Sequence, residues 1–418
     1  MLGSPFQGEV NVKPQLILAT LATSLFAVSY ANAYPVFVDE EKGIAVNVGA
    51  LLQPWFQTTV AASEGQGSTA PPPGIGAPDR KSPSWDFFIR RARLMLWGSV
   101  NKELSYFIET DQPNLGKGGN FTVPMFVQDA FLTYAFMPEF KIDFGLMLLP
   151  FSHHTVEGAT GLNALDYHAD LIRFPAAFVF RDVGVQFRGL LLEDMLYYRV
   201  GIFEGVRNAV VPPITPPPVP PRPPLNETGL PRITGQVRFN LMGSEPDFFL
   251  KGIYFSAKPL VSIGFGMDYQ PNAVYKLNGQ PGAYFAGSID AFAEYPLSAD
   301  DELIGQANLF MYPEGASTIP GTNSLPAGAT AFYAQAGFRH KFIEPLVFVD
   351  YLKAKNNTLT IVAPHAGVNF WVIKHQFNVK VDLGYRKADT LVAATMTTPA
   401  TTLTTKDILG TVQAQVFF

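Results

Sequence analysis

Apolar and polar residues alternate in short segments along most of the chain. Between residues 232 and 240, for example, Arg232, Gln236 and Arg238 alternate with the apolar Ile233 and Val237. Successive side chains of a β-strand point to opposite faces, so this period of two predicts strands with one polar and one apolar face. The same pattern is clear at 378–386 and 412–418.

Sixteen strands are expected from this pattern. They cover residues 43–58, 85–99, 104–112, 124–136, 140–150, 178–191, 195–205, 231–241, 258–270, 283–295, 302–312, 329–342, 345–354, 359–373, 376–387 and 405–418. The even number matches a closed antiparallel barrel in which the last strand pairs with the first. The alternation continues to the final residue, the aromatic Phe418, where a soluble protein would commonly end in a polar tail.

Short and long connections between these strands alternate. The long ones are 59–84, 113–123, 151–177, 206–230, 271–282, 313–328 and 388–404. Two connections break the rule, because 355–358 is short and 242–257 is long. The fold class predicted is therefore an all-β, sixteen-stranded antiparallel transmembrane barrel with short periplasmic turns, long extracellular loops and an inward-folded third loop.

Composition supports a barrel in lipid rather than a soluble domain. Charged residues make up 16%, aromatic residues 13%, and the mean hydropathy is +0.12. After residue 33 there is no run of about 18 apolar residues that could form a spanning helix. No change of composition divides the chain, so residues 34–418 are expected to form a single barrel domain.

The N-terminus has the pattern of a secretory signal peptide. Lys13 precedes an apolar region from Leu16 to Val28 and the small-residue motif Ala31-Asn32-Ala33. The alternative, an anchoring helix, would need a longer apolar core. Residues 1–33 are thus expected to be cleaved, which places the mature chain in the outer membrane of a Gram-negative bacterium. The first strand follows Tyr34 by about ten residues, too few for the plug domain of an energised transporter.

Several classes of function are excluded by composition. The absence of cysteine rules out disulfides, thiolate metal sites and attached c-type haem. A net charge of −5 gives no reason to expect nucleic acid as a partner. No nucleophile with a paired base is evident, so neither catalysis nor a cofactor is predicted. The Pro-rich segment Val211–Pro224 is expected to be an exposed spacer in the fourth outer loop, with peptide recognition as the alternative.

The connection 151–177 is predicted to fold into the barrel as a constriction. Loops of more than about 15 residues are usually functional or disordered, and this one has apolar residues to pack with. Its polar candidates are His153, His154, Glu157, Asp166, Tyr167, His168, Asp170 and Arg173. A metal site would need several of them to converge, and adjacent residues such as His153 and His154 usually point apart in an extended chain.

The polar faces of the strands are expected to line the pore. Ten basic and ten acidic residues fall on these faces, which predicts no strong ion preference. The pore-lining candidates are Arg91, Arg93, Glu109, Asp111, Asp143, Asp182, Arg188, Arg199, Arg238, Asp290, Lys380 and Arg386. Basic and acidic clusters could face each other across the lumen, or Arg91 and Arg93 could pair with the neighbouring Glu109 and Asp111. Arg90 is out of phase with both, at the headgroup level or at a bulge.

Five segments in order resemble the phosphate-selective porin O and P family. They are Phe87–Gly98, Gly145–Ser152, Arg181–Gln186, Gly201–Gly205 and Gly367–Phe370 continuing to Lys380–Asp382. The resemblance implies a sixteen-stranded porin, usually a homotrimer, whose third loop constricts the pore. Where members commonly have a lysine two residues before Pro150 and a basic residue at position 97, this chain has Leu148 and Trp97. The family name is therefore not carried over as a phosphate assignment.

Three functions remain open at this stage. The first is a passive porin for small hydrophilic solutes or ions, narrowed by the loop 151–177. The second is an anion or phosphate channel using an arginine ladder of Arg91, Arg93, Arg188, Arg199 and Arg238. The third is a structural barrel that sheathes a partner protein.

Overall fold

The computed structural model describes residues 34–61, 83–174, 177, 179–207, 223–245, 247–276, 280–312, 328–355, 358–392 and 401–418. These residues form seventeen β-strands and two short 3₁₀ helices. None of their helices has the length and apolar character needed to cross a membrane. The predicted signal peptide lies outside the described residues, as does the Pro-rich segment 211–224 apart from its last two residues.

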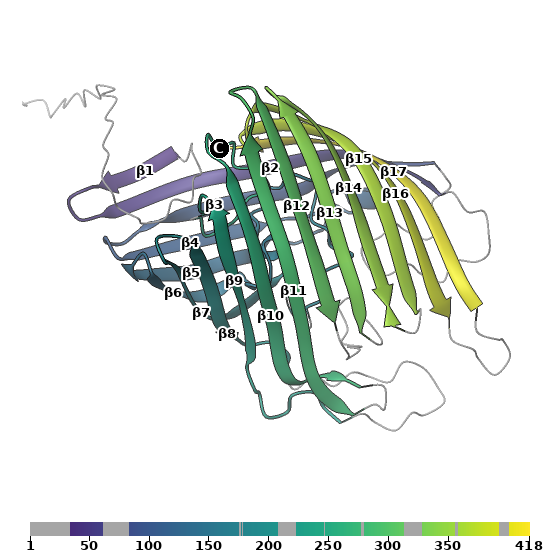
Figure 1. The fold of residues 1–418 in the computed structure, drawn as a ribbon, viewed down its shortest axis with the longest axis horizontal. Coiled ribbons are helices and arrows are strands. Elements are labelled where there is room, and N and C mark those ends of the chain that lie inside the picture. Colours follow the sequence, from purple (N-terminus) through teal and green to yellow (C-terminus); the bar gives the residue numbers. More distant parts are fainter. Residues whose placement is uncertain are drawn as a thin grey trace, which may run out of the picture.

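Sixteen strands form the closed antiparallel barrel (Figure 1). They are β2 (Ile44–Ala61), β3 (Ser84–Ser99), β4 (Leu104–Asp111), β5 (Phe126–Met137), β6 (Phe140–Leu148), β7 (Arg181–Leu191), β8 (Leu196–Phe203), β9 (Arg232–Met242), β10 (Leu260–Tyr275), β11 (Pro281–Pro296), β12 (Asp301–Tyr312), β13 (Ala329–His340), β14 (Ile343–Ala354), β15 (Leu359–Ile373), β16 (Phe377–Val392) and β17 (Thr401–Phe417). Each pairs with its neighbour in sequence, and β17 closes the barrel on β2 with Gln413 opposite Trp55. The sixteen predicted strands are confirmed, with ends displaced by five residues or fewer.

A further strand, β1 (Tyr34–Asp39), was missed by the sequence analysis. It forms a hairpin with the start of β2, and Gly43 adopts the left-handed φ of +69° in the turn. Strand β17 pairs with β2 from Leu51 onward, so β1 covers the part of that edge which β17 does not reach. The run of strand-favouring residues Val36, Phe37 and Val38 before a turn containing glycine was the signal that could have predicted it.

The two faces of the strands differ as the alternation predicted. On β9, Arg238 is fully buried while the adjacent Phe239 is 47% exposed, and on β6 Asp143 is buried while Phe144 is 59% exposed. An apolar outer face of this kind is typical of a membrane barrel, in which the outward-facing side chains of each strand contact lipid. The polar face of each strand is turned to the interior.

The connections separate the barrel into a short-turn end and a long-loop end. Six short connections lie at one end: 100–103, 138–139, 192–195, 297–300, 341–342 and 374–376. The connection at 271–282, predicted to be long, is reduced to 276–280 because β10 and β11 continue toward each other. The anomalous long connection at the short-turn end is present and spans residues 243–259.

Two connections fold into the barrel, and we call residues 149–180 loop L3 and residues 243–259 turn T4. L3 joins β6 to β7 at the long-loop end, and T4 joins β9 to β10 at the other end. Phe151 and Leu171 of L3 share a buried apolar cluster with Phe248 and Leu250 of T4 and with Phe131 of the wall. The interior is therefore filled in large part by the chain's own segments.

Candidate functional site

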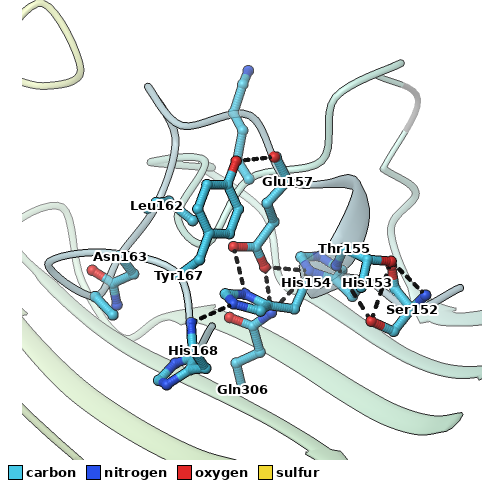
Figure 2. Close-up of polar contacts among 12 residues, drawn as sticks. Ser152, His153, His154, Thr155, Glu157, Leu162, Asn163, Tyr167, His168 and Gln306 are labelled. Atoms are coloured by element: carbon cyan, nitrogen blue, oxygen red, sulfur yellow. Dashed lines mark hydrogen bonds and ion pairs between the residues drawn. The ribbon is translucent and has the colours of Figure 1, made fainter. Parts of the chain in front are cut away.

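L3 enters the barrel through a tight turn. The turn is a 3₁₀ helix, His154–Val156, preceded by reciprocal hydrogen bonds in which the Ser152 amide donates to Thr155 Oγ1 (2.9 Å) and the Thr155 amide to Ser152 Oγ (3.3 Å). Such local side-chain bonds favour turns over extended chain. The expectation that His153 and His154 point apart is wrong for this reason, because both imidazoles contact Glu157 (Figure 2).

His153 lies between two carboxylates. Its Nδ1 is 2.7 Å from Glu157 Oε1, and its Nε2 is 2.7 Å from Glu245 Oε1 of T4. Burial lowers the pKa of His153, but the two carboxylates outweigh that effect and raise the pKa to about 9. The same contacts hold the pKa of Glu157 well below its ordinary value and lower that of Glu245 to about 2, against the opposing effect of burial. At neutral pH this is a charged histidine shared by two ionised carboxylates.

His154 behaves differently although it is the next residue. Burial lowers its pKa, and the main-chain amide of His168 donates to its Nε2 at 3.0 Å. The acceptor role of Nε2 leaves Nδ1 as the donor to Glu157 Oε2, 3.2 Å away. His154 is thus a neutral imidazole in a fixed tautomer. Gln306 of β12 also contacts Glu157 through its amide nitrogen.

L3 is fastened to β3 through Asp166. Arg90 Nε is 2.7 Å from Asp166 Oδ2, and Arg91 contacts the other carboxylate oxygen. A β-bulge lies here, since Gln53 pairs with Arg91 and the next residue, Pro54, pairs with Ile89. A bulge can turn two consecutive side chains to the same face, and the two arginines share one acid in this way. Of the two alternatives for Arg90, the bulge is confirmed.

The rest of L3 reaches the opposite wall. Lys380 Nζ of β16 donates to the carbonyls of Leu162 (2.6 Å) and Ala164 (2.8 Å), and Asn163 donates to Glu344 of β14 at 2.8 Å. These contacts fix the middle of the loop.

Three further residues of L3 contact the wall. His168 Nδ1 lies 2.6 Å from Asp350 Oδ1 on β14. Burial lowers the pKa of His168, but the neighbouring Asp350 carboxylate outweighs this effect, and the pKa is raised. Arg386 Nε on β16 is 2.8 Å from Asp170 Oδ2. The main-chain amide of Arg173 donates to the Tyr312 hydroxyl of β12 at 3.1 Å. Together with the Asp166 contact, they tie L3 to both sides of the barrel.

Tyr167 links the turn at the start of L3 to its middle. Its hydroxyl donates to the main-chain carbonyl of Glu157 at 2.6 Å (Figure 2). The Arg91 guanidinium lies 5.4 Å from the centre of its ring, within the range of a cation–π contact.

T4 meets L3 inside the barrel. The Leu250 amide donates to the carbonyl of Val156 and the Gly158 amide donates to the carbonyl of Leu250, both at 3.0 Å, which makes a parallel bridge between Glu157 and Leu250. A third bond runs from the Gly252 amide to the Gly161 carbonyl at 2.9 Å. With the His153–Glu245 contact, the two segments form one hydrogen-bonded unit.

T4 is itself attached to the wall. Both oxygens of Glu294 on β11 accept main-chain amides, from Tyr254 and Ser256, at 2.5 Å. Arg199 of β8 donates to the carbonyl of Asp247 at 3.1 Å and also to that of Phe248. The T4 backbone is therefore held by side chains from β8 and β11, the two strands that flank the β9–β10 pair.

The predicted pore-lining residues all lie on the interior face, but most do not border open water. Each of the following is buried except the half-buried Arg386: Arg91, Arg93, Glu109, Asp111, Asp143, Asp182, Arg188, Arg199, Arg238, Asp290, Lys380 and Arg386. The charges are paired locally. Arg93 binds Glu109 (2.7 Å) and Asp111 (3.1 Å), whereas Arg91 binds Asp166 instead of these two acids.

Other interior charges are also paired with nearby residues of opposite charge. Arg188 lies 2.8 Å from Asp143, Arg238 contacts Asp290, and Arg232 lies 3.1 Å from Asp182. Opposite charges thus neutralise each other along the wall instead of facing one another across the lumen.

Several interior residues were not singled out in the sequence. They are Glu245, Asp247, Glu302, Gln306 and Glu344. Glu302 and Glu344 are the second residues of β12 and β14, close to strand boundaries that are hard to place. The unusual length of the connection around Glu245 was visible, but nothing in its sequence indicated that it folds inward.

No metal centre is assembled by these groups. Among the residues that the structure describes, no three His, Cys, Asp or Glu side chains are grouped so that they could hold an ion. The histidines of L3 are used in carboxylate and main-chain contacts.

Comparisons with known proteins agree with this architecture. Residues 74–210 match the family model described as phosphate-selective porin O and P, which confirms the resemblance over about a third of the chain. A comparison with curated protein sequences finds no match.

Three solved structures are similar in fold. Salmonella typhi OmpF in complex with daunomycin has a TM-score of 0.55 at 12% identity, covering 92% of this chain and 100% of that one. The outer membrane channel DcaP of Acinetobacter baumannii has a TM-score of 0.52 at 13% identity, covering 91% and 99%. The trimer form of OmpT from Vibrio cholerae has a TM-score of 0.50 at 10% identity, covering 89% and 99%.

Proposed function

We propose that this outer-membrane β-barrel, which matches the phosphate-selective porin O and P family over residues 74–210, is a passive channel for small hydrophilic solutes and ions. The observation that carries the proposal is the contrast between the outer and inner faces of the barrel wall. The outer face is apolar, whereas the interior holds charged side chains from nearly every strand. A closed barrel with that arrangement offers polar solutes a route through lipid.

L3 narrows the lumen in this proposal, and T4 supports it from the short-turn end. L3 is bound to β3 on one side and to β12, β14 and β16 on the other. The interior residues that keep partial contact with water mark the passage. Among them are Arg90 (23% exposed side chain), Asp166 (21%), Asp170 (33%), His365 (18%) and Arg386 (15%).

The anion-channel alternative is less well supported. Every arginine of the predicted ladder is buried and already has an acid or a carbonyl as acceptor. The two positions where family members commonly carry basic residues hold Leu148 and Trp97, which are also buried. An anion would have to displace existing ion pairs, and breaking a buried pair costs about 3–5 kcal/mol.

The sheath alternative has little support. L3 and T4 occupy the interior and share one apolar cluster with the wall. A threaded partner protein would have to remove both segments.

We also infer a homotrimer embedded in outer-membrane lipid. Vibrio cholerae OmpT, which is similar in fold, is described as a trimer.

The test is conductance of the purified protein in planar lipid bilayers. Stepwise, ohmic conductance increments are expected without any added partner or energy source. A variant in which Gly158–Phe174 is replaced by a short Gly-Ser linker should give larger increments, because the constriction is removed. Absence of conductance in the wild-type protein would contradict the channel, and unchanged conductance in a folded loop variant would contradict the constriction.

A further inference from the structure

The balance of charge inside the barrel differs from the ten-to-ten balance expected from the sequence. Among the described residues, and with the histidines left out, the buried charged side chains comprise nine basic and fifteen acidic ones. The acidic side chains absent from the sequence-based set are Glu157, Glu245, Asp247, Glu302 and Glu344. Three of these belong to L3 and T4, so the inward-folded segments add acid to the interior.

The half-buried interior charges do not reverse this excess. Their inclusion raises the totals to fourteen basic and eighteen acidic side chains, and the added residues are Arg90, Lys141, Lys251, Arg339, Arg386, Asp166, Asp170 and Asp407. Glu294 and Glu302 lie diagonally on adjacent strands, since Glu294 is opposite Ile304. Counting that pair as a single charge leaves seventeen acidic side chains against fourteen basic ones.

One site that water still reaches holds more acid than base. On β16, Arg386 is bound by Asp170 of L3 at 2.8 Å and stands directly opposite Asp407 of β17 in the strand register. One guanidinium therefore has two carboxylates beside it. Nearby, Asp382 pairs with His365 at 2.7 Å.

From this distribution we propose that the channel prefers cations over anions, with Asp170 and Asp407 as selectivity-determining residues. The inference rests on the proposed channel function and concerns the class of ion that passes. Carboxylates that line a narrow path raise the local concentration of cations and lower that of anions. Most arginines that could oppose this effect are buried, and the half-buried Arg90 and Arg386 are each paired with an aspartate.

The experiment is the reversal potential of the wild-type protein in a tenfold KCl gradient across a planar bilayer. A sign that corresponds to potassium preference is expected, and added phosphate should not block the current. Asp407→Asn and Asp170→Asn should each lower the cation-to-anion permeability ratio by about fourfold, because one unit charge at roughly 8 Å in water changes the local concentrations of cation and anion by about twofold each, in opposite directions. The matched control is Glu103→Gln, which removes an acid from an exposed turn outside the lumen and should leave the ratio unchanged.

The outcomes separate the two proposals. Conductance with chloride preference, no preference, or block by phosphate would overturn the cation inference and leave the channel intact. A folded protein without conductance would overturn the channel function itself. Equal effects of Glu103→Gln and Asp407→Asn would show that selectivity comes from overall charge and not from the lumen.

Discussion

His153 lies between two carboxylates that reach it from opposite ends of the barrel. Glu157 belongs to L3 and Glu245 to T4, and each approaches one ring nitrogen at 2.7 Å. Since both acids are buried and ionised, the protonated imidazole is what allows them to lie close together. Removing the charge would leave two buried carboxylates repelling each other.

Stability should therefore depend on pH through His153. Its pKa in the folded state, about 9, is above the ordinary value of 6.5, so its contribution is fully present below about pH 6.5 and is lost as pH rises through 9. The shift corresponds to about 3 kcal/mol. Urea unfolding of the detergent-solubilised barrel between pH 6.5 and 10 should show this loss, and His153→Gln should flatten the curve.

His340 provides the control for this measurement. It pairs with Asp301 at 2.7 Å, but 57% of its side chain is exposed, and exposed ion pairs contribute little. His340→Gln should keep the wild-type pH dependence. A His153→Gln protein with an unchanged slope would refute the role assigned to the buried histidine.

Among the structural elements, T4 determines how rigidly L3 is held. Three main-chain hydrogen bonds of about 3 Å and the His153–Glu245 contact join the two segments. Loops that carry function are often positioned by a rigid scaffold, and in this barrel the support of L3 comes partly from the opposite end.

Replacement of residues 247–257 by a short turn should loosen L3. We expect noisier current, larger conductance increments and faster proteolysis of L3 in the folded barrel, because the bridge to Val156 and Gly158 is lost. The control of similar length is deletion of 211–222, the segment expected to be a spacer, which should leave the current unchanged. Quiet, wild-type current in the T4 variant would show that the wall contacts of L3 are sufficient.

For the whole molecule, the apolar outer face has to be covered by lipid or by further copies of the chain. We expect light scattering of the detergent-solubilised protein to give about three times the monomer mass before heating and one monomer mass after denaturation. The assembled form should conduct in increments of three when channels insert together. A single monomer mass before heating would contradict the trimer and leave the barrel and its lumen unaffected.

The strands and their faces could be predicted from the sequence because alternation is a local property. Arg238 and Phe239 face opposite sides in any strand, whatever the rest of the chain does. Strand β1 was missed although its signal was local. The predicted start of β14 at residue 345 left out Glu344, and Glu302 was the first residue of the predicted strand 302–312, so neither acid was assigned to the interior.

The charged network of the interior could not be predicted in this way. The bulge at Arg90 turns two arginines toward Asp166, and a 3₁₀ turn brings His153 and His154 to one carboxylate. The contacts of Arg90 and Arg91 with Asp166, and of His153 with Glu245, join residues far apart in the chain, so they depend on where L3 and T4 are placed once the barrel has closed.

The sequence by itself determined the class of the protein, the number of barrel strands and the two faces of the sheet, since these follow from residue order at a period of two. Tertiary structure alone decided that T4 folds inward, that His153 joins it to L3, and that acid exceeds base in the interior. The physical reason is that a buried charge is tolerated only with a partner, and the partners come from distant strands and loops that meet when the barrel closes.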